Sequence, residues 1–505
     1  MNLFLSDLDY RYEMENLCRL FFPHERIEVA LSSDLKEGDL AAWAGFSPDG
    51  TKAAAAVLCG GQRYEGEQTI AFGPSDEAER CLGVALYRAL CAACKVQPAW
   101  GILTGVRPAK LFATLAREQG DMDAAQQYME QKLLVSPDKT ALCRRVAEAE
   151  SRCAGRPGRR DYSLYLSIPF CPTRCAYCSF VSHSIEKAGK LLPGYLDALE
   201  RELQAIAGLA DSLSLRLKTV YIGGGTPTTL SAGQLARLME AVRRSFDLRS
   251  GQEFTVEAGR PDTITREKLM ALKEGGVTRL AVNPQTLDDR VLEAIGRRHT
   301  AAQTMQAFAL ARECGFDNIN MDLIAGLPLD TLDGFARTLD GVLSLAPEGI
   351  TVHTLSMKRS SSLAEKRESL SRAEQMDRTG PAPDGEERGW LAADMQRLAG
   401  ETLDEASYAP YYLYRQSKML GNLENVGWSL PGYEGLYNIY MMNELHTVLG
   451  AGAGAVTRLK DPESGNIERV FNFKYPYEYI GRFDEMLHRK QQIRAFYDAL
   501  DQADP

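Results

Sequence analysis

Three cysteines stand close together in the segment SIPFCPTRCAYCSF, at positions 171, 175 and 178. Their spacing places three thiolates in one short loop, and thiolates are soft ligands that suit iron–sulfur clusters or zinc. A structural zinc site needs four closed ligands, and no second CxxC pair follows at finger-like spacing. Cys171, Cys175 and Cys178 therefore favour a 4Fe-4S cluster with one iron left open. Three cysteines that serve only as apolar filler are the alternative.

The elements that must position this loop follow from the pattern after Asp161, where short apolar runs alternate with amphipathic helical stretches. The apolar runs cover residues 165–170, 219–225, 254–259, 279–285, 319–326 and 350–356, and the helical stretches cover 193–208, 232–246, 264–275, 301–314 and 331–345. This alternation predicts a parallel βα repeat, either an incomplete barrel or a doubly wound sheet. In both folds the chemistry lies at the carboxyl ends of the strands, and the cysteine loop follows the first run.

The segment Tyr165-Leu-Ser-Ile-Pro-Phe-Cys171-x3-Cys175-x-Tyr177-Cys178, followed by GGGTPT, resembles the radical S-adenosylmethionine (SAM) superfamily. Within it, the sequence resembles the oxygen-independent coproporphyrinogen III oxidase (coproporphyrinogen dehydrogenase) family. The segments WGILTGVRPAK and LGNLENVGWSLPGYEGLYNIYMMNE resemble sequences from the branch of this family that is found in Gram-positive bacteria. The resemblance implies an α/β fold with a partial (β/α)6 TIM-like barrel, an N-terminal α+β and helical domain, and a mainly helical C-terminal domain.

The resemblance also implies the cofactors and their contacts. Cys171, Cys175 and Cys178 would hold a 4Fe-4S cluster whose fourth iron binds SAM, and the protein would orient SAM and exclude water. The family's SAM contacts match Tyr165, Gly224, Gly225, Thr226, Glu257, Gln285, Arg297, Asp322 and Ile324. Taken singly, each is more often a cap, a surface charge or a packing residue. One position departs from the family, because Ser167 stands where a histidine is usual.

Three functions compete. The first is oxidative decarboxylation of two propionates of coproporphyrinogen III, giving protoporphyrinogen IX in haem biosynthesis, with a flavodoxin or ferredoxin as electron donor. The second is a haem-binding chaperone, a related family with a His-Asn-x-x-Tyr-Trp element, where this sequence has Tyr437 to Met442 without that histidine. The third is a radical SAM enzyme with another substrate. Arg260, Arg415 and Lys418 could bind the carboxylates of a tetrapyrrole, although solvated surface is the commoner fate of such side chains.

The sequence divides into five predicted segments. Residues 1–100 form an α+β domain with strand-like runs at 26–31, 52–58 and 67–72 and helices near 12–21 and 78–96. Residues 101–160 form a helical connector. The radical SAM core covers 161–358, a polar linker covers 359–389, and residues 390–505 form a C-terminal domain expected to cover the substrate.

Composition limits the remaining classes of function. The net charge of −10 excludes a general nucleic-acid binder, and no apolar run is long enough to cross a membrane. The first residues are acidic, unlike a signal peptide, so we expect a cytoplasmic protein, and we expect a monomer. Cys91 and Cys94 are interpreted as structural thiols, the Gly450 to Ala455 run as a tight turn, and His299 as a residue that either lies near SAM or only packs.

Overall fold

The computed structural model describes the 505-residue chain except for residues 24, 37, 71–74, 106, 156, 179, 181, 250, 357–387, 417–418 and 504–505. The chain divides into two compact units. Unit 1 comprises Met1–Ala147 and Tyr414–Glu424, and unit 2 comprises Glu148–Leu413 and Asn425–Pro505. The predicted domains 1–100 and 101–160 share unit 1 as far as Ala147. The predicted linker 359–389 lies outside the described residues up to residue 387.

Unit 1 contains a five-stranded sheet in the order β2-β1-β3-β4-β5. The strands are β1 (Asn2–Leu5), β2 (Glu28–Leu31), β3 (Leu40–Phe46), β4 (Lys52–Cys59) and β5 (Gln62–Thr69). Helices α1 (Arg11–Phe21) and α2 (Ser75–Cys94) share one buried core with this sheet. Gly66 allows β5 to approach α2 closely, since a Cβ there would lie 2.1 Å from the Ala85 carbonyl oxygen. Both predicted helices are confirmed, whereas β3 was not predicted.

The rest of unit 1 is helical, as the sequence predicted. It contains α3 (Pro108–Gln119), α4 (Met122–Gln131), the part of α5 (Pro137–Cys153) up to Ala147, and the short 3-10 helix η5 (Leu420–Asn422). Gly120 ends α3 in the left-handed conformation, with φ 70°. Asp121 then caps α4 by accepting hydrogen bonds from the backbone N–H groups of Asp123 and Ala124.

Unit 2 is built on an eleven-stranded sheet in the order β14-β15-β13-β12-β11-β10-β9-β6-β16-β17-β18. Its central strands are β6 (Asp161–Ile168), β9 (Arg216–Gly224), β10 (Glu253–Glu257), β11 (Arg279–Ala281), β12 (Ile319–Ala325) and β13 (Gly349–Thr354). They are parallel and follow one another in chain order. A doubly wound sheet would reverse direction at a switch point, so this order establishes the partial barrel.

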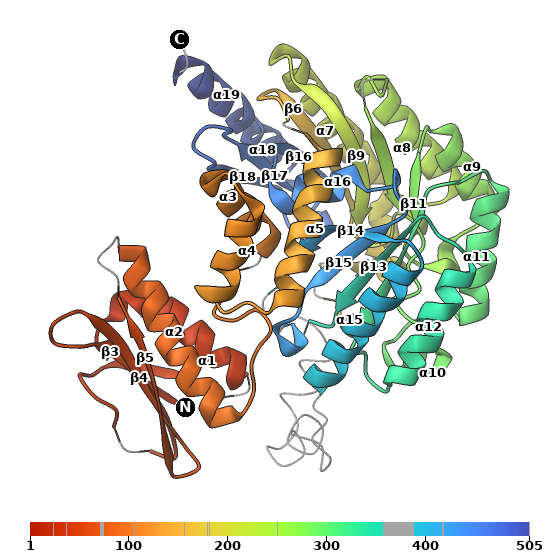
Figure 1. The fold of residues 1–505 in the computed structure, drawn as a ribbon. Helices are drawn as coiled ribbons and strands as arrows, with labels where there is room; N and C mark the ends of the chain where they lie inside the picture. The colour runs from red at the N-terminus through yellow and green to blue at the C-terminus, as the bar shows by residue number, and fades with distance from the viewer. Residues whose placement is uncertain are drawn as a thin grey trace. The chain divides into compact units, whose positions relative to one another are not determined.

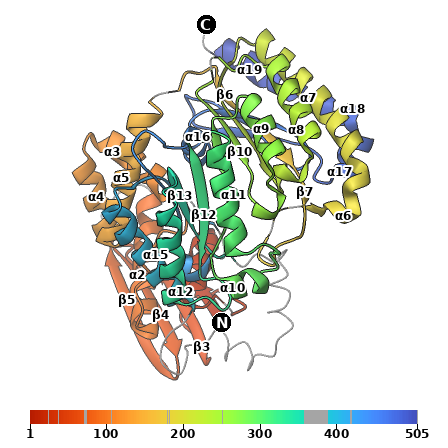
Figure 2. The same cartoon turned by 90° about the vertical axis from the view of Figure 1, so that its right-hand side faces the viewer.

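The helices between these strands lie close to their predicted positions. They are α7 (Leu192–Ser212), α8 (Ala232–Ser245), α9 (Arg266–Glu274), α11 (Ala301–Glu313) and α12 (Leu332–Ser344), with the unpredicted short helix α10 (Asp289–Ala294) before α11. Figures 1 and 2 show them along the outer face of the sheet. The strand residues Leu164, Leu166 and Val220 are almost fully buried, as expected for a face covered by helices.

The residues that alternate with this apolar set are mostly polar and face the inside of the barrel. Helix α16 (Leu436–Asn443) lies on this inner side. Glu253 accepts hydrogen bonds from the backbone N–H groups of Leu436, at 2.6 Å, and Tyr437, at 3.3 Å. Arg279 donates to the Tyr433 carbonyl at 2.6 Å. The amino ends of β10 and β11 therefore anchor α16 inside the barrel.

The C-terminal part contributes more strand than the sequence predicted. It has β14 (Ala409–Tyr414), β15 (Asn425–Ser429), β16 (Thr447–Ala451), β17 (Val456–Lys460) and β18 (Ile467–Phe471), all in the large sheet. Its helices besides α16 are α15 (Arg388–Glu405), α17 (Pro476–Gly481), α18 (Phe483–Arg489) and α19 (Gln491–Ala503). Strand β16 runs parallel to β6 and extends the barrel sheet beyond its first strand.

The glycine-alanine run after β16 forms a tight turn, which confirms the interpretation from sequence. Gly452 has φ 90°, and a Cβ there would lie 2.5 Å from the Ser167 carbonyl oxygen. The turn packs on a buried ion pair between Glu202 and Lys490, at 2.9 Å. The Gly452 N–H donates to Glu202 at 2.7 Å, and the Lys490 ammonium donates to the Gly450 carbonyl at 2.6 Å. Among the described residues, no helix is long and apolar enough to cross a bilayer.

Candidate functional site

The cysteine loop leaves the first barrel strand at its carboxyl end. Two short strands, β7 (Phe170–Cys171) and β8 (His183–Ser184), pair in parallel at the two ends of the loop. The three thiol groups of Cys171, Cys175 and Cys178 influence one another electrostatically, and burial raises the pKa of Cys171 and Cys178. The structure thus gathers the three predicted ligands at the edge of the barrel where the sequence placed them.

Two buried arginines surround the middle cysteine. Arg260 donates to the Cys175 sulfur at 3.6 Å and to the Thr173 hydroxyl at 3.0 Å. Burial alone would raise the pKa of Cys175, but the positive charges of Arg297 and Arg260 outweigh it and hold that pKa below its ordinary value. Arg260 was considered for substrate carboxylates, whereas here its charge faces a thiol and the Asp262 carboxylate, at 3.2 Å.

Arg297 is held by backbone and side-chain acceptors. It donates to the Asn283 carbonyl at 2.6 Å and to the Tyr177 hydroxyl at 3.1 Å. Its Nε atom is buried and has no partner among the described residues, and the Asn283 side-chain oxygen is in the same state. Buried donors and acceptors without partners are costly, so this pair marks a place where a polar ligand would be stabilised.

The glycine turn after β9 packs directly on the start of the cysteine loop. The Gly225 N–H donates to the Ile168 carbonyl at 2.8 Å, and the Thr226 N–H donates to the Phe170 carbonyl at 2.7 Å. A Cβ at Gly225 would lie 2.6 Å from the Phe170 carbonyl oxygen, and Gly224 has φ 109°. The Thr226 hydroxyl donates to the Cys171 sulfur at 3.5 Å. Gly224 and Gly225 have no side chain at the point where two stretches of backbone meet.

Two carboxyl groups inside the barrel have opposite properties. Burial raises the pKa of Glu257 to about 7, and the Tyr221 hydroxyl, which donates to it at 2.5 Å, only partly opposes this effect. Burial would also raise the pKa of Asp322, but hydrogen bonding and the charge of His353 reverse the shift and lower it. The His353 Nε2 atom lies 3.7 Å from Asp322. The site therefore pairs a carboxyl that holds a proton near neutral pH with one that is ionised.

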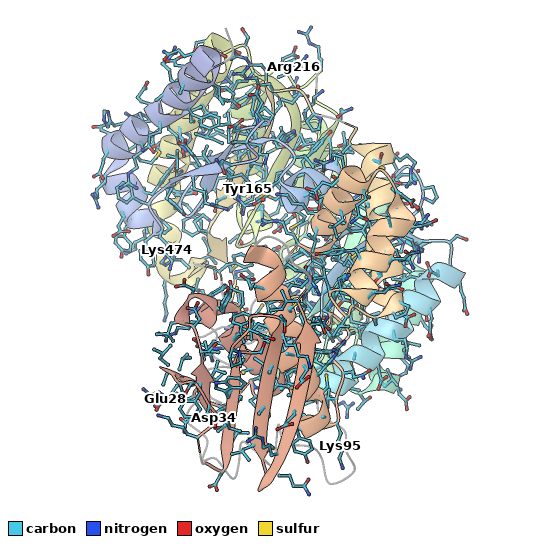
Figure 3. All side chains as sticks on the ribbon, turned by 60° about the vertical axis from the view of Figure 1, so that its left-hand side comes forward. Glu28, Asp34, Lys95, Tyr165, Arg216 and Lys474 are labelled. Atoms are coloured by element: carbon cyan, nitrogen blue, oxygen red, sulfur yellow. The ribbon has the colours of Figure 1, made fainter. Side chains whose placement is uncertain are left out.

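Three tyrosines stack next to these carboxyl groups. Tyr221 and Tyr437 have ring centroids 4.4 Å apart, and Tyr165 stacks on them at 6.2 Å and 6.3 Å (Tyr165 is labelled in Figure 3). The hydroxyl of Tyr437 is buried and has no partner among the described residues. The stack provides a flat apolar surface with polar edges at the inner side of the barrel.

The remaining predicted contacts lie on the neighbouring strand ends. Gln285 is buried with φ 72°, and its backbone exchanges hydrogen bonds with the backbone of β12, accepting from Ile324 N at 3.0 Å and donating to Asp322 O at 2.9 Å. This left-handed conformation is unusual for a residue other than glycine and occurs often at functional sites. Gln285, Asp322 and Ile324 are thus fixed by one backbone junction.

Several residues at the site were not proposed as site residues from the sequence. Tyr221 and His353 lie in predicted strands at positions that alternate with apolar residues, so the period of two contained the signal that they face the barrel interior. Tyr437 depends on the long-range packing of α16, for which no local pattern exists. His299 is buried 3.8 Å from Asp262, and burial lowers its pKa to about 4, which favours the packing interpretation.

Ser167 stands in the place of the family's histidine and is buried. Its carbonyl accepts a hydrogen bond from the Tyr195 hydroxyl at 2.6 Å. Its side chain lies beside Gly224, since a Cβ at that glycine would be 2.9 Å from the serine oxygen. The position therefore contributes a small hydroxyl packed on the glycine turn.

The donor set fits a cluster better than a single ion. Among the described residues, no three His, Cys, Asp or Glu side chains converge on one point as ligands of a single metal ion. An iron–sulfur cluster distributes its thiolate ligands over different iron atoms, so convergence on one point is not required. Three thiols on one loop, positive charge at the middle one and the unpartnered Arg297 nitrogen all fit an anionic cluster with a polar ligand.

Comparison with known proteins extends this picture. Residues 165–341 match the model of the Radical SAM superfamily. The oxygen-independent coproporphyrinogen-III oxidase-like protein HemZ of Bacillus subtilis is 38% identical over 396 residues, which cover 77% of this chain and 76% of that protein. The heme chaperone HemW of Lactococcus lactis is 30% identical over 338 residues, covering 66% of this chain and 80% of that protein.

A solved structure shows the same fold. The coproporphyrinogen III oxidase HemN of Escherichia coli, described as a radical SAM enzyme, superposes with a TM-score of 0.50 at 26% sequence identity. The match covers 67% of this chain and 72% of that chain.

Proposed function

The chain belongs to the radical SAM family that includes the HemZ protein of Bacillus subtilis, and on this premise we propose that it is an oxygen-independent coproporphyrinogen III dehydrogenase. The proposed reaction converts two propionate side chains of coproporphyrinogen III to vinyl groups and releases two molecules of CO2, giving protoporphyrinogen IX in haem biosynthesis. Each propionate loses one hydrogen atom, one CO2 and one electron. The balance therefore requires two equivalents of SAM, two electrons from a donor to cleave them, and an acceptor for the two electrons released.

Cys171, Cys175 and Cys178 are the residues that would hold the 4Fe-4S cluster, with SAM on the fourth iron. When bound, the cluster and SAM would supply the radical chemistry that removes a hydrogen atom from the propionate β-carbon. Arg297 would neutralise the SAM carboxylate, because its Nε atom is buried and has no partner among the described residues. Tyr165 would pack against the adenine, and the stack behind it would exclude water.

The carboxyl groups have separate tasks in this proposal. Glu257 holds a proton near neutral pH and can donate a hydrogen bond, whereas Asp322 is ionised and can only accept. A ribose hydroxyl pair offers both donors and acceptors, and a SAM ammonium offers donors. Glu257 and Asp322 would therefore offer complementary hydrogen-bonding partners to such a ligand.

The residue at position 437 is the observation that favours the enzyme over the haem chaperone. The chaperone element has a histidine able to bind haem iron, and this chain has Tyr437 there, only 4% exposed and stacked on Tyr221 inside the barrel. A ring fixed in this way supports a packing role. The cytoplasm is the proposed location, a flavodoxin or ferredoxin is the proposed electron donor, and a monomer is the proposed state.

The test is an anaerobic reaction with reconstituted protein, SAM, a reductant and coproporphyrinogen III, followed by oxidation and chromatography of the porphyrins. We expect protoporphyrin from the wild type and none from Cys175→Ala. Cys91→Ala, which changes a thiol of unit 1, is the matched control and keeps the activity. SAM cleavage without protoporphyrin would contradict the substrate, and a Cys175→Ala protein that still cleaved SAM would contradict the ligand assignment.

The haem chaperone is the second candidate, supported by the match to the heme chaperone HemW of Lactococcus lactis. It requires haem binding without turnover of coproporphyrinogen. Absorbance titration with haem distinguishes the two functions, because a 1:1 complex of the wild type that is abolished in Tyr437→Phe would favour the chaperone.

A further inference from the structure

Residues from two distant parts of the chain meet within unit 1, and the barrel site uses none of them. The segment at 100–108 contributes Trp100, whose indole N–H donates to Glu424 at 2.8 Å. The segment at 414–424 contributes Arg415, whose Nη1 donates to the carbonyls of Leu103, at 2.8 Å, and Gly105, at 3.2 Å. The Arg415 guanidinium lies 5.2 Å from the centre of the Trp100 ring. Residues more than 300 positions apart in the chain thus surround one buried arginine.

One edge of Arg415 has no hydrogen-bond partner. Its Nε and Nη2 atoms are buried, and none of the residues that the structure describes accepts from them. The side chain as a whole is only 3% exposed. The Nε and Nη2 hydrogens of an arginine point in parallel and form the fork that binds a carboxylate through two hydrogen bonds. Arg415 therefore keeps this fork open while Nη1 holds the backbone.

A second buried arginine of unit 1 shows the fork occupied. Arg80 donates from Nε to Glu77 at 3.0 Å, and its Nη2 donates to the other oxygen of the same carboxylate. Arg80 is 9% exposed, whereas Arg415 is 3% exposed. The difference is that the chain supplies a carboxylate to Arg80 and supplies none to the fork of Arg415.

The charges around Arg415 do not balance. The carboxylate of Glu424 is shared between the Trp100 indole and the ammonium of Lys139, with which it forms a close ion pair. Burial raises the pKa of Cys143 next to these groups, so its thiol stays neutral. Of the described groups that act on one another here, two cations, Arg415 and Lys139, and one anion, Glu424, leave a net charge of +1. Burial lowers the pKa of Arg415 to about 10, which still keeps it charged at neutral pH.

We propose that Arg415 is the anchor of a carboxylate-binding site in unit 1. A single carboxylate would occupy the open fork, satisfy both donors and bring the charge of the cluster to zero. A phosphate fits less well, because it carries close to two negative charges and more acceptor oxygens than these two donors serve. Gly105, whose carbonyl accepts from Arg415 Nη1, is exposed, and a Cβ there would meet open space.

The carboxylate that binds Arg415 has two candidate sources, a free carboxylic acid and a propionate side chain of the tetrapyrrole. Only the second source rests on the proposed function. Both are tested on the full-length protein without SAM or reductant, so the outcome does not depend on turnover. The probes are propionate, coproporphyrin III and inorganic phosphate, and binding is followed by isothermal titration and tryptophan fluorescence, to which Trp100 contributes.

The variants separate the fork from the charge. Arg415→Lys keeps the charge and loses the fork, and Arg415→Met loses both. The matched control is Arg80→Met, where the fork already has its own carboxylate. We expect Arg415→Lys to weaken binding of at least one carboxylate probe by about tenfold or more, Arg415→Met to abolish that binding, and Arg80→Met to change it by less than about twofold.

The probe whose binding is lost identifies the source of the bound carboxylate. Loss of propionate binding in Arg415→Lys assigns a free acid, and loss confined to coproporphyrin III assigns the tetrapyrrole. The proposal is overturned if the wild type binds neither carboxylate, if it prefers phosphate, or if Arg415→Lys binds both carboxylates like the wild type. Decarboxylation that proceeds in a wild type without this binding would overturn the carboxylate site and leave the proposed function intact.

Discussion

Replacing Gly225 by alanine tests whether the glycine turn fixes the cysteine loop. The new Cβ would lie 2.6 Å and 2.8 Å from the Phe170 carbonyl oxygen and nitrogen and 2.9 Å from the Ile168 carbonyl oxygen. All three are backbone atoms, so no side chain can rotate away. The turn and β7 must separate by several tenths of an ångström.

The cost follows from the contacts that separate. Overpacking of this kind costs about 1–3 kcal/mol. The backbone hydrogen bonds from Gly225 to Ile168 and from Thr226 to Phe170 weaken as well, at about 1 kcal/mol each. We therefore expect a loss of about 2–4 kcal/mol, which corresponds to a fall in Tm of roughly 3–6 °C for a unit of this size. Because Cys171 follows Phe170, cluster assembly should fall more steeply than stability.

The assay compares Tm of the apo protein and iron content after reconstitution. Gly233→Ala is the matched control, because Gly233 lies in α8 and a Cβ there meets open space. Alanine should leave that helix unchanged or stabilise it by up to about 1 kcal/mol. A Gly225→Ala protein with the same Tm and iron content as Gly233→Ala would refute the argument that backbone contact at this turn positions the loop.

Three further changes follow from the buried charges. The pKa of Glu257 is about 7 in the folded protein and 4.5 ordinarily, so this residue makes the free energy of unfolding fall as pH rises between these two values. Glu257→Gln should remove up to about 3 kcal/mol of that fall in urea titrations. Equal pH slopes in the variant and the wild type would contradict this. Tyr221→Phe removes a hydrogen bond that lowers the pKa of Glu257, so the infrared band of the protonated carboxyl should persist to higher pH than in the wild type; an unchanged titration would count against the contact. Lys490→Met leaves the Glu202 carboxylate buried without its cation and should lower the free energy of unfolding in urea by about 3–5 kcal/mol. Arg397→Met, which breaks an exposed pair, should lower it by less than about 1 kcal/mol. Similar losses in the two variants would contradict the role of burial.

The barrel could be predicted from the sequence because its strands and helices have local periods. Each apolar run from Tyr165 to Ser356 became a strand, since buried parallel strands are continuous apolar runs bounded by turn residues. The strands β14 to β18 were missed, because APYYLY has no alternation of apolar and polar residues, and the alternating segment NVGWS covers only five residues. Their pairing partners lie far away in the chain.

The same distinction applies to the candidate site. Spacing and resemblance brought the cysteines and the strand-end residues together correctly at the carboxyl edge of the sheet. Tyr437, Arg260 and the junction of Arg415 with Trp100 depend on contacts between distant segments, which no local pattern encodes. The structure places these residues at the strand ends that the sequence predicted, and it adds the inner lining and the charges around them, whereas their roles remain predictions.

The position of β6 between β9 and β16 sets an order for biosynthesis. The strand that leads into the cysteine loop finds one neighbour within about sixty residues, but its other neighbour begins at Thr447. The Lys490 ammonium, which donates to the Gly450 carbonyl, then fixes the turn after β16. The strand that leads into the cysteine loop therefore gains its second neighbour only after Thr447 to Lys490 have been synthesised. A chain that stops before Thr447 would present the loop on a strand with one open edge.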